Sequence, residues 1–311
     1  MALATSLELD LNKLPLIAFL AVLSLTANAE TYVVVVQGLA GEQRYAEQFD
    51  EQLTTIEAAA DSVTSANRTR VFRVDDARRA GVIEYLDSLK NQLTSDDQLI
   101  VYLIGHGSYD DHEYKFNLPG EDLTGEDLAT ALNALPNENQ LVINSSSASG
   151  ALADLLQNDR RMLILATRSG VERHATRFGM FFAAALEDSS ADTDKNNLVT
   201  AREAFEFAQR GVSDFYDRNN RLATEHPRAE GNRLERITLA RLEAARPARD
   251  DSQLRELVAQ RDALNEEIDE LRLSRDSSSP EAYQQALLPK MLELAQLEDA
   301  IEQREAELNE Q

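Results

Sequence analysis

The sequence contains no cysteine, and this absence excludes several kinds of chemistry. Without a thiol the chain forms no disulfide and has no thiolate nucleophile. A lipid attached to an N-terminal cysteine is excluded for the same reason.

Positive charge is also scarce. The chain has 31 Lys and Arg against 55 Asp and Glu, so its formal net charge is -24. Phosphate binding requires clustered Lys and Arg, so this balance argues against a nucleic-acid partner. It equally disfavours adhesion to anionic lipid. We attribute most of the acidity to solubility and a smaller part to cation binding.

The apolar run at the N-terminus, Leu14–Thr26, is shorter than the roughly 20 residues that a membrane-spanning helix needs. Lys13 precedes this run and a small-x-small sequence follows it at 27–29, which is the pattern of a signal peptide with its cleavage site. We therefore predict that residues 1–29 are a signal peptide and that the protein is exported, to the periplasm or beyond it. An uncleaved anchor is the alternative, because acidic residues precede Lys13.

Short apolar runs alternate with helical patterns along the first half of the chain. Runs that are continuously apolar indicate a parallel sheet covered on both faces. The predicted strands are Tyr32–Gln37, Val71–Val74, Leu99–Ile104, Leu141–Ile143 and Met162–Ala166. Helices are predicted at about 42–60, 79–93, 124–135 and 151–156, the third opened by a capping box at Thr124–Asp127. This alternation predicts a doubly wound α/β fold.

Three segments lack both patterns. Tyr109–Leu118 is predicted as a hairpin or loop over the rim of the sheet, and 222–232 as a loop. Arg236–Leu242 is predicted either as a last strand or as the beginning of the next helix.

Two predicted strands end in turns that carry reactive side chains. Leu99–Ile104 is followed by a Gly-His-Gly-Ser turn containing His106, and Leu141–Ile143 by a serine-rich turn, 144–150. Ligands and chemistry collect beyond the carboxyl ends of the strands in such sheets. We therefore expect His106 and the serine cluster to lie side by side at one rim.

These turns resemble those of the legumain-like and caspase-like cysteine peptidases, whose nucleophile lies in a Cys-x-Ser-Gly turn. Here that tetrad reads Ser147-Ala148-Ser149-Gly150, so serine stands where the family has cysteine. The resemblance covers roughly Tyr32 to Phe215. It implies a caspase-like three-layer α/β sandwich with a mostly parallel sheet, and it implies that His106 and Ser147 occupy the catalytic positions.

Serine in place of cysteine leaves two functional interpretations. A hydroxyl is far less nucleophilic than a thiolate and needs an aligned base and an oxyanion hole. We therefore predict an inactive pseudopeptidase that binds a protein or peptide partner, with His106 in a structural hydrogen bond and the hydroxyls of 145–149 capping the next helix. The alternative is an active periplasmic hydrolase with Ser147 as nucleophile and His106 as base. Arg168 and Arg173 are expected near the same rim, where they bind a carboxylate or, more simply, form ion pairs.

A second pattern runs from Asp192 to Glu203. Oxygen-bearing side chains fall at positions 1, 3, 5, 9 and 12, and position 7 offers a backbone carbonyl, as in an EF-hand calcium loop. Asn197 replaces the usual glycine at position 6, and asparagine tolerates a left-handed backbone best among the other residues. We predict a structural Ca²⁺ site; the alternative is a solvated acidic loop with a helix cap. The predicted ligands are Asp192, Asp194, Asn196, Leu198, Thr200 and Glu203.

From about Asp250 the pattern changes to heptads, with leucine and isoleucine recurring from Leu254 to Leu271 and from Leu287 to Leu308. A turn at 276–280 separates the two series, so we predict a helical hairpin or coiled coil. A lone hairpin buries little, so it should pack on the α/β domain, on a second copy or on another protein. The predicted organisation is a signal peptide (1–29), an α/β domain (30–245, with the EF-hand-like loop at 192–203) and a hairpin (250–311).

Overall fold

The computed structural model of the chain describes residues 29–65, 67–242, 252–273 and 279–309. The predicted signal peptide falls outside these residues except for its last position. Within these ranges, none of the helices has both the length and the apolar character that crossing a membrane would require.

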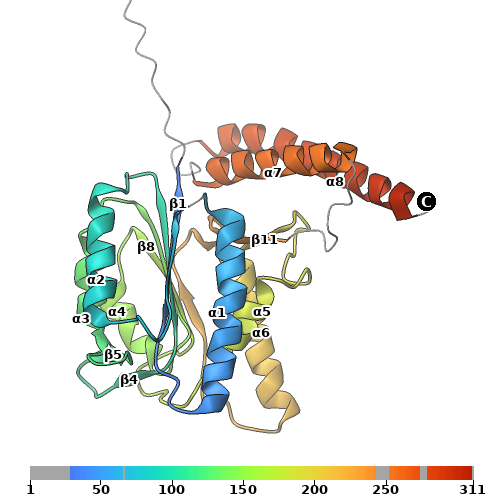
Figure 1. Ribbon diagram of the computed structural model, residues 1–311. Coiled ribbons are helices and arrows are strands. Elements are labelled where there is room, and N and C mark those ends of the chain that lie inside the picture. Colours follow the sequence, from blue (N-terminus) through green and yellow to red (C-terminus); the bar gives the residue numbers. More distant parts are fainter. Residues whose placement is uncertain (1–28, 66, 243–251, 274–278, 310–311) are drawn as a thin grey trace, which may run out of the picture.

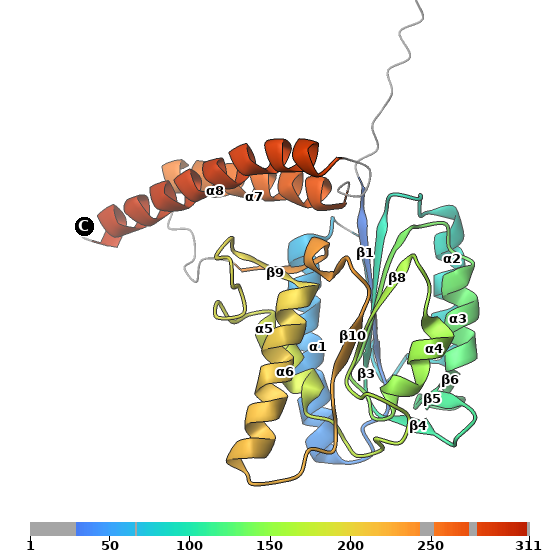
Figure 2. The same cartoon turned by 180° about the vertical axis from the view of Figure 1, so that it is seen from behind.

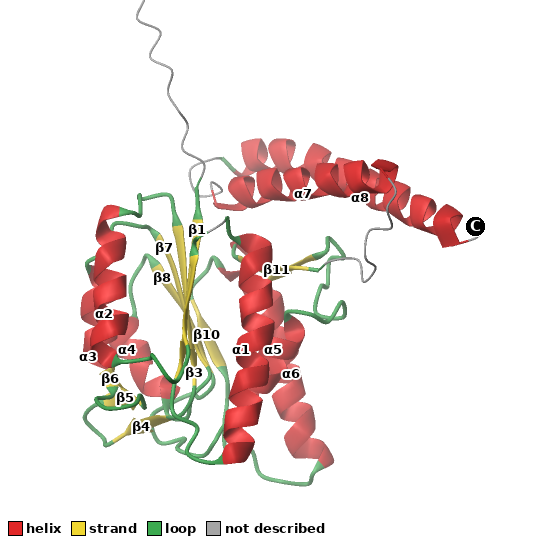
Figure 3. Cartoon of the chain, in the orientation of Figure 1, coloured by secondary structure: helices red, strands yellow, loops and turns green. Residues whose placement is uncertain are grey.

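A six-stranded sheet forms the centre of the α/β domain, in the order β10-β8-β7-β3-β1-β2 (Figure 3). Five strands are parallel, and β10 at the edge runs antiparallel to β8. The strands are β1 (Thr31–Gln37), β2 (Thr69–Phe72), β3 (Gln98–Ile104), β7 (Asn139–Asn144), β8 (Arg161–Leu165) and β10 (Arg228–Glu230). Because β3 and β7 are neighbours in the middle of the sheet, the turns that follow them meet at one rim.

Helices cover both faces of the sheet, which makes the three layers that the resemblance implies (Figures 1 and 2). One face carries α1 (Gln43–Val63), α5 (Phe178–Ala185) and α6 (Ala201–Arg218). The other carries α2 (Arg79–Ser88), α3 (Gly125–Asn133) and α4 (Ala153–Leu156), with short 3-10 turns at η1 (Leu89–Asn91) and η2 (Ser149–Leu152). The predicted α/β fold is confirmed, and α3 begins with the predicted Thr124–Asp127 capping box.

The continuous apolar runs have a simple cause in this architecture. In β1, Val33 and Val35 belong to the core under α1, α5 and α6, whereas Val34 and Val36 belong to the core under α2, α3 and α4. Side chains of a strand point alternately to the two faces, and both faces are buried here. Successive positions in the middle of such a strand are therefore apolar.

Two smaller sheets lie outside this core. A three-stranded antiparallel sheet at the rim contains β4 (Gly107–Tyr109), β5 (Tyr114–Phe116) and β6 (Leu123–Thr124), so Tyr109–Leu118 forms a hairpin. At the opposite end of the domain, β9 (Leu198–Thr200) pairs with β11 (Thr238–Arg241). Of the two alternatives for 236–242, the structure therefore has the last strand.

The prediction of a loop over the whole of 222–232 is wrong, because residues 228–230 form β10. Arg228, Ala229 and Glu230 pair with β8 at the edge of the sheet. A three-residue edge strand of mixed charge is only half-buried and therefore lacks the apolar signature of the central strands.

Two long helices, α7 (Ser252–Leu273) and α8 (Pro280–Asn309), follow the α/β domain and pack on each other. Leu264, Ile268 and Leu294 form their small shared core. Figure 1 shows the pair at the end of the domain where β1 begins, and α7 contacts η3 (Leu234–Arg236) there. The pair therefore lies far from the rim at which β3 and β7 end.

Candidate functional site

His106 lies directly after β3, on the side of the sheet covered by α1. Its Nε2 atom is 3.1 Å from the carbonyl oxygen of Ala40. The ring also packs edge-on against Tyr45 and Phe49 of α1, at centroid distances of 4.8 and 5.2 Å. A carbonyl can only accept, so Nε2 carries the ring proton. Partial burial lowers the pKa of His106 below its ordinary value, which keeps the ring neutral at pH 7.

Ser147 lies at the same rim, in the turn after β7. Its side chain is 4% exposed, and its hydroxyl donates a hydrogen bond of 2.9 Å to the carbonyl oxygen of Gly107. Glycine at 107 lets the two turns touch, because a Cβ there would lie 2.6 Å from the carbonyl oxygen of Ser147. The structure thus brings the turns of His106 and Ser147 together at one rim, as the sequence predicts.

The His106 ring and the Ser147 hydroxyl bond to different partners in this structure. No hydrogen bond joins the His106 ring to the Ser147 hydroxyl within the described residues. The proton of Ser147 points to a backbone carbonyl, and Nε2 of His106 is held by another. Serine becomes a nucleophile only when an aligned base takes its proton, and in this arrangement no hydrogen bond aligns His106 with Ser147.

The other hydroxyls of the serine turn connect it to neighbouring strands. Ser145 donates to the carbonyl oxygen of Leu103 at the end of β3, and Ser149 lies 3.2 Å from the hydroxyl of Thr167 after β8. The prediction that these hydroxyls cap the next helix is wrong, because η2 starts after Ala148 without a side-chain cap. The hydroxyls bond instead to groups of the neighbouring strands and turns, which surround the serine turn.

Sequence analysis missed two residues that complete this turn. The hydroxyl of Tyr114 lies 2.6 Å from that of Ser146 and accepts a bond of 2.9 Å from the amide of Asn144. Burial raises the pKa of Tyr114 to about 12, so it remains a neutral phenol. Asn144 at the end of an apolar strand is a signal in the sequence. Tyr114 gives none, because its contact depends on how the β4–β5 hairpin folds back.

The arginines beyond β8 form ion pairs at this rim. Arg173 is 2.6 Å from a carboxylate oxygen of Asp111, and Arg168 is 3.6 Å from one of Glu172. Glu172 also lies 2.6 Å from Nδ1 of His226, which joins the loop before β10 to the loop after β8. Arg168 and Arg173 therefore form ion pairs, which is the simpler of the two expectations for them.

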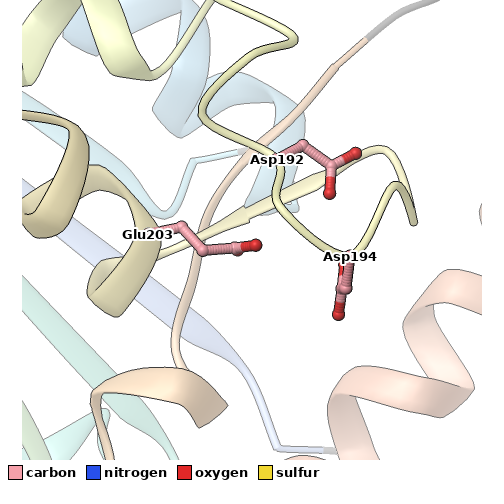
Figure 4. A group of neighbouring side chains, drawn as sticks. All are labelled: Asp192, Asp194 and Glu203. Atoms are coloured by element: carbon pink, nitrogen blue, oxygen red, sulfur yellow. The ribbon is translucent and has the colours of Figure 1, made fainter.

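The EF-hand-like loop brings three carboxylates together at the other end of the domain (Figure 4). Oxygen atoms of Asp192, Asp194 and Glu203 all lie within 4.8 Å of one another. Asn197, at the position usually held by glycine, has φ of 60°, which is the left-handed conformation that the pattern requires. The remaining predicted ligands, Asn196, Leu198 and Thr200, are buried in the same loop.

Glu203 is also part of a helix cap. One of its oxygens accepts bonds from the backbone and hydroxyl of Thr193, and the other accepts bonds from the backbone and hydroxyl of Thr200. Burial alone would raise the pKa of Glu203, but these hydrogen bonds outweigh it and hold the pKa below its ordinary value. The carboxylate is therefore ionised, as a calcium ligand must be, and at the same time closes the capping box of α6.

The strand within the loop has a partner from the same chain. β9 contains positions 7 to 9 of the loop and pairs with β11, and the backbone N–H of Leu242 donates to the carbonyl oxygen of Asn197. In paired EF-hands the two calcium loops pair with each other. Here β11 takes the place of the second loop.

Comparison with known proteins identifies one family. The model of the peptidase C13 family matches residues 50–226, more than half of the chain, and the match includes His106 and Ser147. None of the curated proteins matches this sequence.

Several solved structures are similar to the chain at low sequence identity. Protein GSU0716 from Geobacter sulfurreducens is 13% identical, with 69% of this chain and 100% of that one covered and a TM-score of 0.45. Caspase-1 from Spodoptera frugiperda is 9% identical, with 70% and 93% covered and a TM-score of 0.42. A secreted C11 cysteine protease from Bacteroides thetaiotaomicron is 13% identical, with 59% of each chain covered and a TM-score of 0.34.

Proposed function

This chain belongs to the peptidase C13 family, the legumain-like cysteine peptidases, and we propose that it is an exported member without peptidase activity that binds or scaffolds a partner. The observation that carries the proposal is the hydrogen bond from Ser147 to the carbonyl oxygen of Gly107. This bond uses the proton of the Ser147 hydroxyl, and Ser147 stands at the nucleophile position of the resemblance in a chain without cysteine.

The neighbourhood of Ser147 supports an inactive site. A positioned general base contributes about 10²- to 10⁴-fold to a rate, and a serine hydroxyl depends on it more than a thiol does. His106 is neutral and so could accept a proton, but Tyr45, Phe49 and the carbonyl of Ala40 hold its ring against α1. A His106 ring that turned toward Ser147 would lose its contacts with Tyr45, Phe49 and the Ala40 carbonyl.

The two helices α7 and α8 support a binding role. Leu288 and Leu292 lie one turn apart on α8 and are 72% and 61% exposed. Exposed leucines at this spacing are typical of a helix face that meets a protein or peptide partner. A second copy of the chain is the other occupant that this face would suit. We propose that the partner is bound there or at the rim.

A serine-reactive fluorophosphonate probe tests the inactive site. We expect no covalent label on the purified protein at neutral pH. If the protein is labelled, and Ser147→Ala removes the label whereas Ser108→Ala retains it, the chain is an active serine hydrolase with His106 as base and the pseudopeptidase proposal is wrong. Ser108 is the matched control because it is an exposed serine on the same rim.

We also propose that the loop 192–203 binds Ca²⁺, held by Asp192, Asp194, Asn196, Thr200, Glu203 and the backbone carbonyl of Leu198. Hard oxygen donors from six positions are what this cation requires, and three converging carboxylates supply the negative charge. The bound cation would supply only charge neutralisation and a fixed loop. Glu203 would have to exchange part of its hydrogen bonding to Thr193 for the cation.

Isothermal titration of the chelator-treated protein with CaCl₂ tests this site. We expect one site per chain, lost in Asp192→Asn and retained in Asp188→Asn, which removes the same charge from the loop just before it. Absence of binding heat in the wild type, or equal binding in Asp192→Asn, would contradict the proposal.

A further inference from the structure

The outer side of α5 and α6 carries a cavity that neither the rim nor the EF-hand-like loop uses. It is a solvent-open hollow of about 600 Å³, lined mainly by residues of α5 and α6. Figure 2 shows these two helices in the layer that covers one face of the sheet. Ligand-binding pockets typically enclose about 300–1,000 Å³, so the size suits a small organic molecule.

Phenylalanine side chains form the walls of this cavity. Phe181 comes from α5, and Phe207 and Phe215 come from α6; all three are only partly buried. Gly211 of α6 lies next to the Phe181 ring of α5, and a Cβ at Gly211 would lie 2.6 Å from that ring. The glycine thus lets the ring lie against α6 and leaves an apolar surface open to solvent.

Cationic side chains surround these rings, although the chain as a whole carries a net charge of -24. Arg210 lines the cavity and makes no hydrogen bond or ion pair with any other described residue. The guanidinium of Arg177 lies 5.0 Å from the centre of the Phe215 ring. Asp214 is the single carboxylate of the lining. Its negative charge is balanced by Arg218, also in the lining, at 3.3 Å. Arg210 therefore remains as an uncompensated positive charge at the edge of an apolar hollow.

We propose that this cavity binds an amphiphilic carboxylate, meaning an alkyl or aryl group that carries one carboxylate. The apolar part packs against Phe181, Phe207 and Phe215, and the carboxylate pairs with Arg210. A guanidinium binds a carboxylate through two parallel N–H···O bonds, and an arginine without another partner is free to do so. A neutral ligand would leave Arg210 unused, and a phosphate or nucleotide would have no use for the aromatic walls beyond one ring. This inference does not depend on whether the rim is catalytically active.

The test uses decanoate as the probe and decanol as its neutral counterpart, both below the concentrations at which they aggregate. Binding of decanoate to the full chain is followed by titration calorimetry, and amide chemical shifts locate the site. We expect shifts confined to α5, α6 and the two lining residues beyond these helices, Ser190 and Asn219. Arg210→Gln should weaken decanoate binding about tenfold, which corresponds to the loss of one charge-assisted hydrogen-bonding pair, and should leave decanol binding unchanged.

Arg202→Gln is the matched control, because Arg202 is on the same helix but outside the cavity, near Glu235. This variant should bind decanoate like the wild type. The proposal is overturned if decanoate does not bind, if Arg210→Gln and Arg202→Gln weaken it equally, or if the perturbed amides lie away from α5, α6, Ser190 and Asn219. Equal loss of decanoate and decanol in Arg210→Gln would also overturn it, because the arginine would then act through the fold and not through its charge.

Discussion

The serine turn at the rim and the EF-hand-like loop at the other end of the domain are both built from short polar motifs, but they use their polar atoms differently. At the rim each serine hydroxyl has a neutral hydrogen-bonding partner from a neighbouring turn or strand. In the loop three carboxylates converge within 4.8 Å. The loop therefore gathers negative charge that a cation would offset, whereas the serine turn gathers only neutral groups.

The rim is held together by hydrogen bonds between neutral groups and by close backbone contacts. The predictions that follow disturb the two regions separately and are arranged by the size of the expected effect.

Gly150→Ala should disturb the rim most. A Cβ at this position would lie 2.2 Å from the backbone nitrogen of Ser169, and backbone cannot move aside as a flexible side chain can. We expect a loss of about 3 kcal/mol in the free energy of unfolding, measured by urea denaturation.

Gly81→Ala is the control for that substitution. Gly81 is in α2, and the nearest atom to its added Cβ is in the Phe72 ring at 3.9 Å. Alanine there should be neutral or stabilise by up to about 1 kcal/mol. Similar losses in both variants would mean that the close approach of Gly150 and Ser169 does not restrain the rim.

Calcium should stabilise the protein by acting on the loop alone. A ligand at about 100 times its Kd adds about 2.7 kcal/mol to the free energy of unfolding when it binds only the folded state. We expect thermal melting to shift upward with CaCl₂ and to return with chelator. In Asp192→Asn the shift should vanish, whereas in Ser147→Ala it should persist in full. A shift that depends on Ser147 would mean that the two regions are not independent.

Tyr114→Phe should cost more stability than Ser147→Ala, although it is Ser147 that the resemblance aligns with the nucleophile. Removing the phenolic hydroxyl leaves both Ser146 and the amide of Asn144 without that partner in a fully buried place, which costs about 2 kcal/mol. Removing the Ser147 hydroxyl leaves only the carbonyl of Gly107, which should cost about 1 kcal/mol. The reverse order in urea denaturation would show that Ser147, and not Tyr114, holds the turn.

The smallest expected effect is the pH dependence contributed by His106. Its pKa is lowered in the folded state because burial disfavours the imidazolium, so the unfolded chain binds the proton more tightly. Stability should therefore be complete above the unfolded pKa of about 6.5 and should fall as the pH drops below it. His106→Gln should flatten this part of the stability profile. The contribution of Glu203, whose pKa is also lowered, is lost at more acidic pH and should remain in that variant.

The strands were predictable because burial on both faces imposes a rule on every residue. The middle of β1, β3, β7 and β8 is continuously apolar for this reason, and their order in the chain predicted which turns would meet. β10 was not predictable, because an edge strand only three residues long carries no such rule.

The contacts within the candidate site were less predictable than its location. The motif placed Ser147 at the rim and suggested a structural bond for His106, but the partners Gly107, Ala40 and Tyr114 come from segments far away along the chain. Asn197 shows the opposite case, because its left-handed backbone follows from a local pattern and was expected from sequence alone. Local backbone conformation depends on adjacent residues, whereas hydrogen bonds between separate turns depend on the complete tertiary structure.

The most direct measurement of the central claim is the thiol pKa in Ser147→Cys, taken from the pH dependence of alkylation by iodoacetamide. The chain has no other cysteine, so the signal belongs to one atom. A thiol that donates to the Gly107 carbonyl and has no imidazolium beside it should titrate at or above the ordinary value of about 8.5, no lower than the exposed thiol of Ser108→Cys. A pKa below about 6.5, raised by adding His106→Gln, would show that the histidine and residue 147 form an ion pair, and the inactive site would be contradicted.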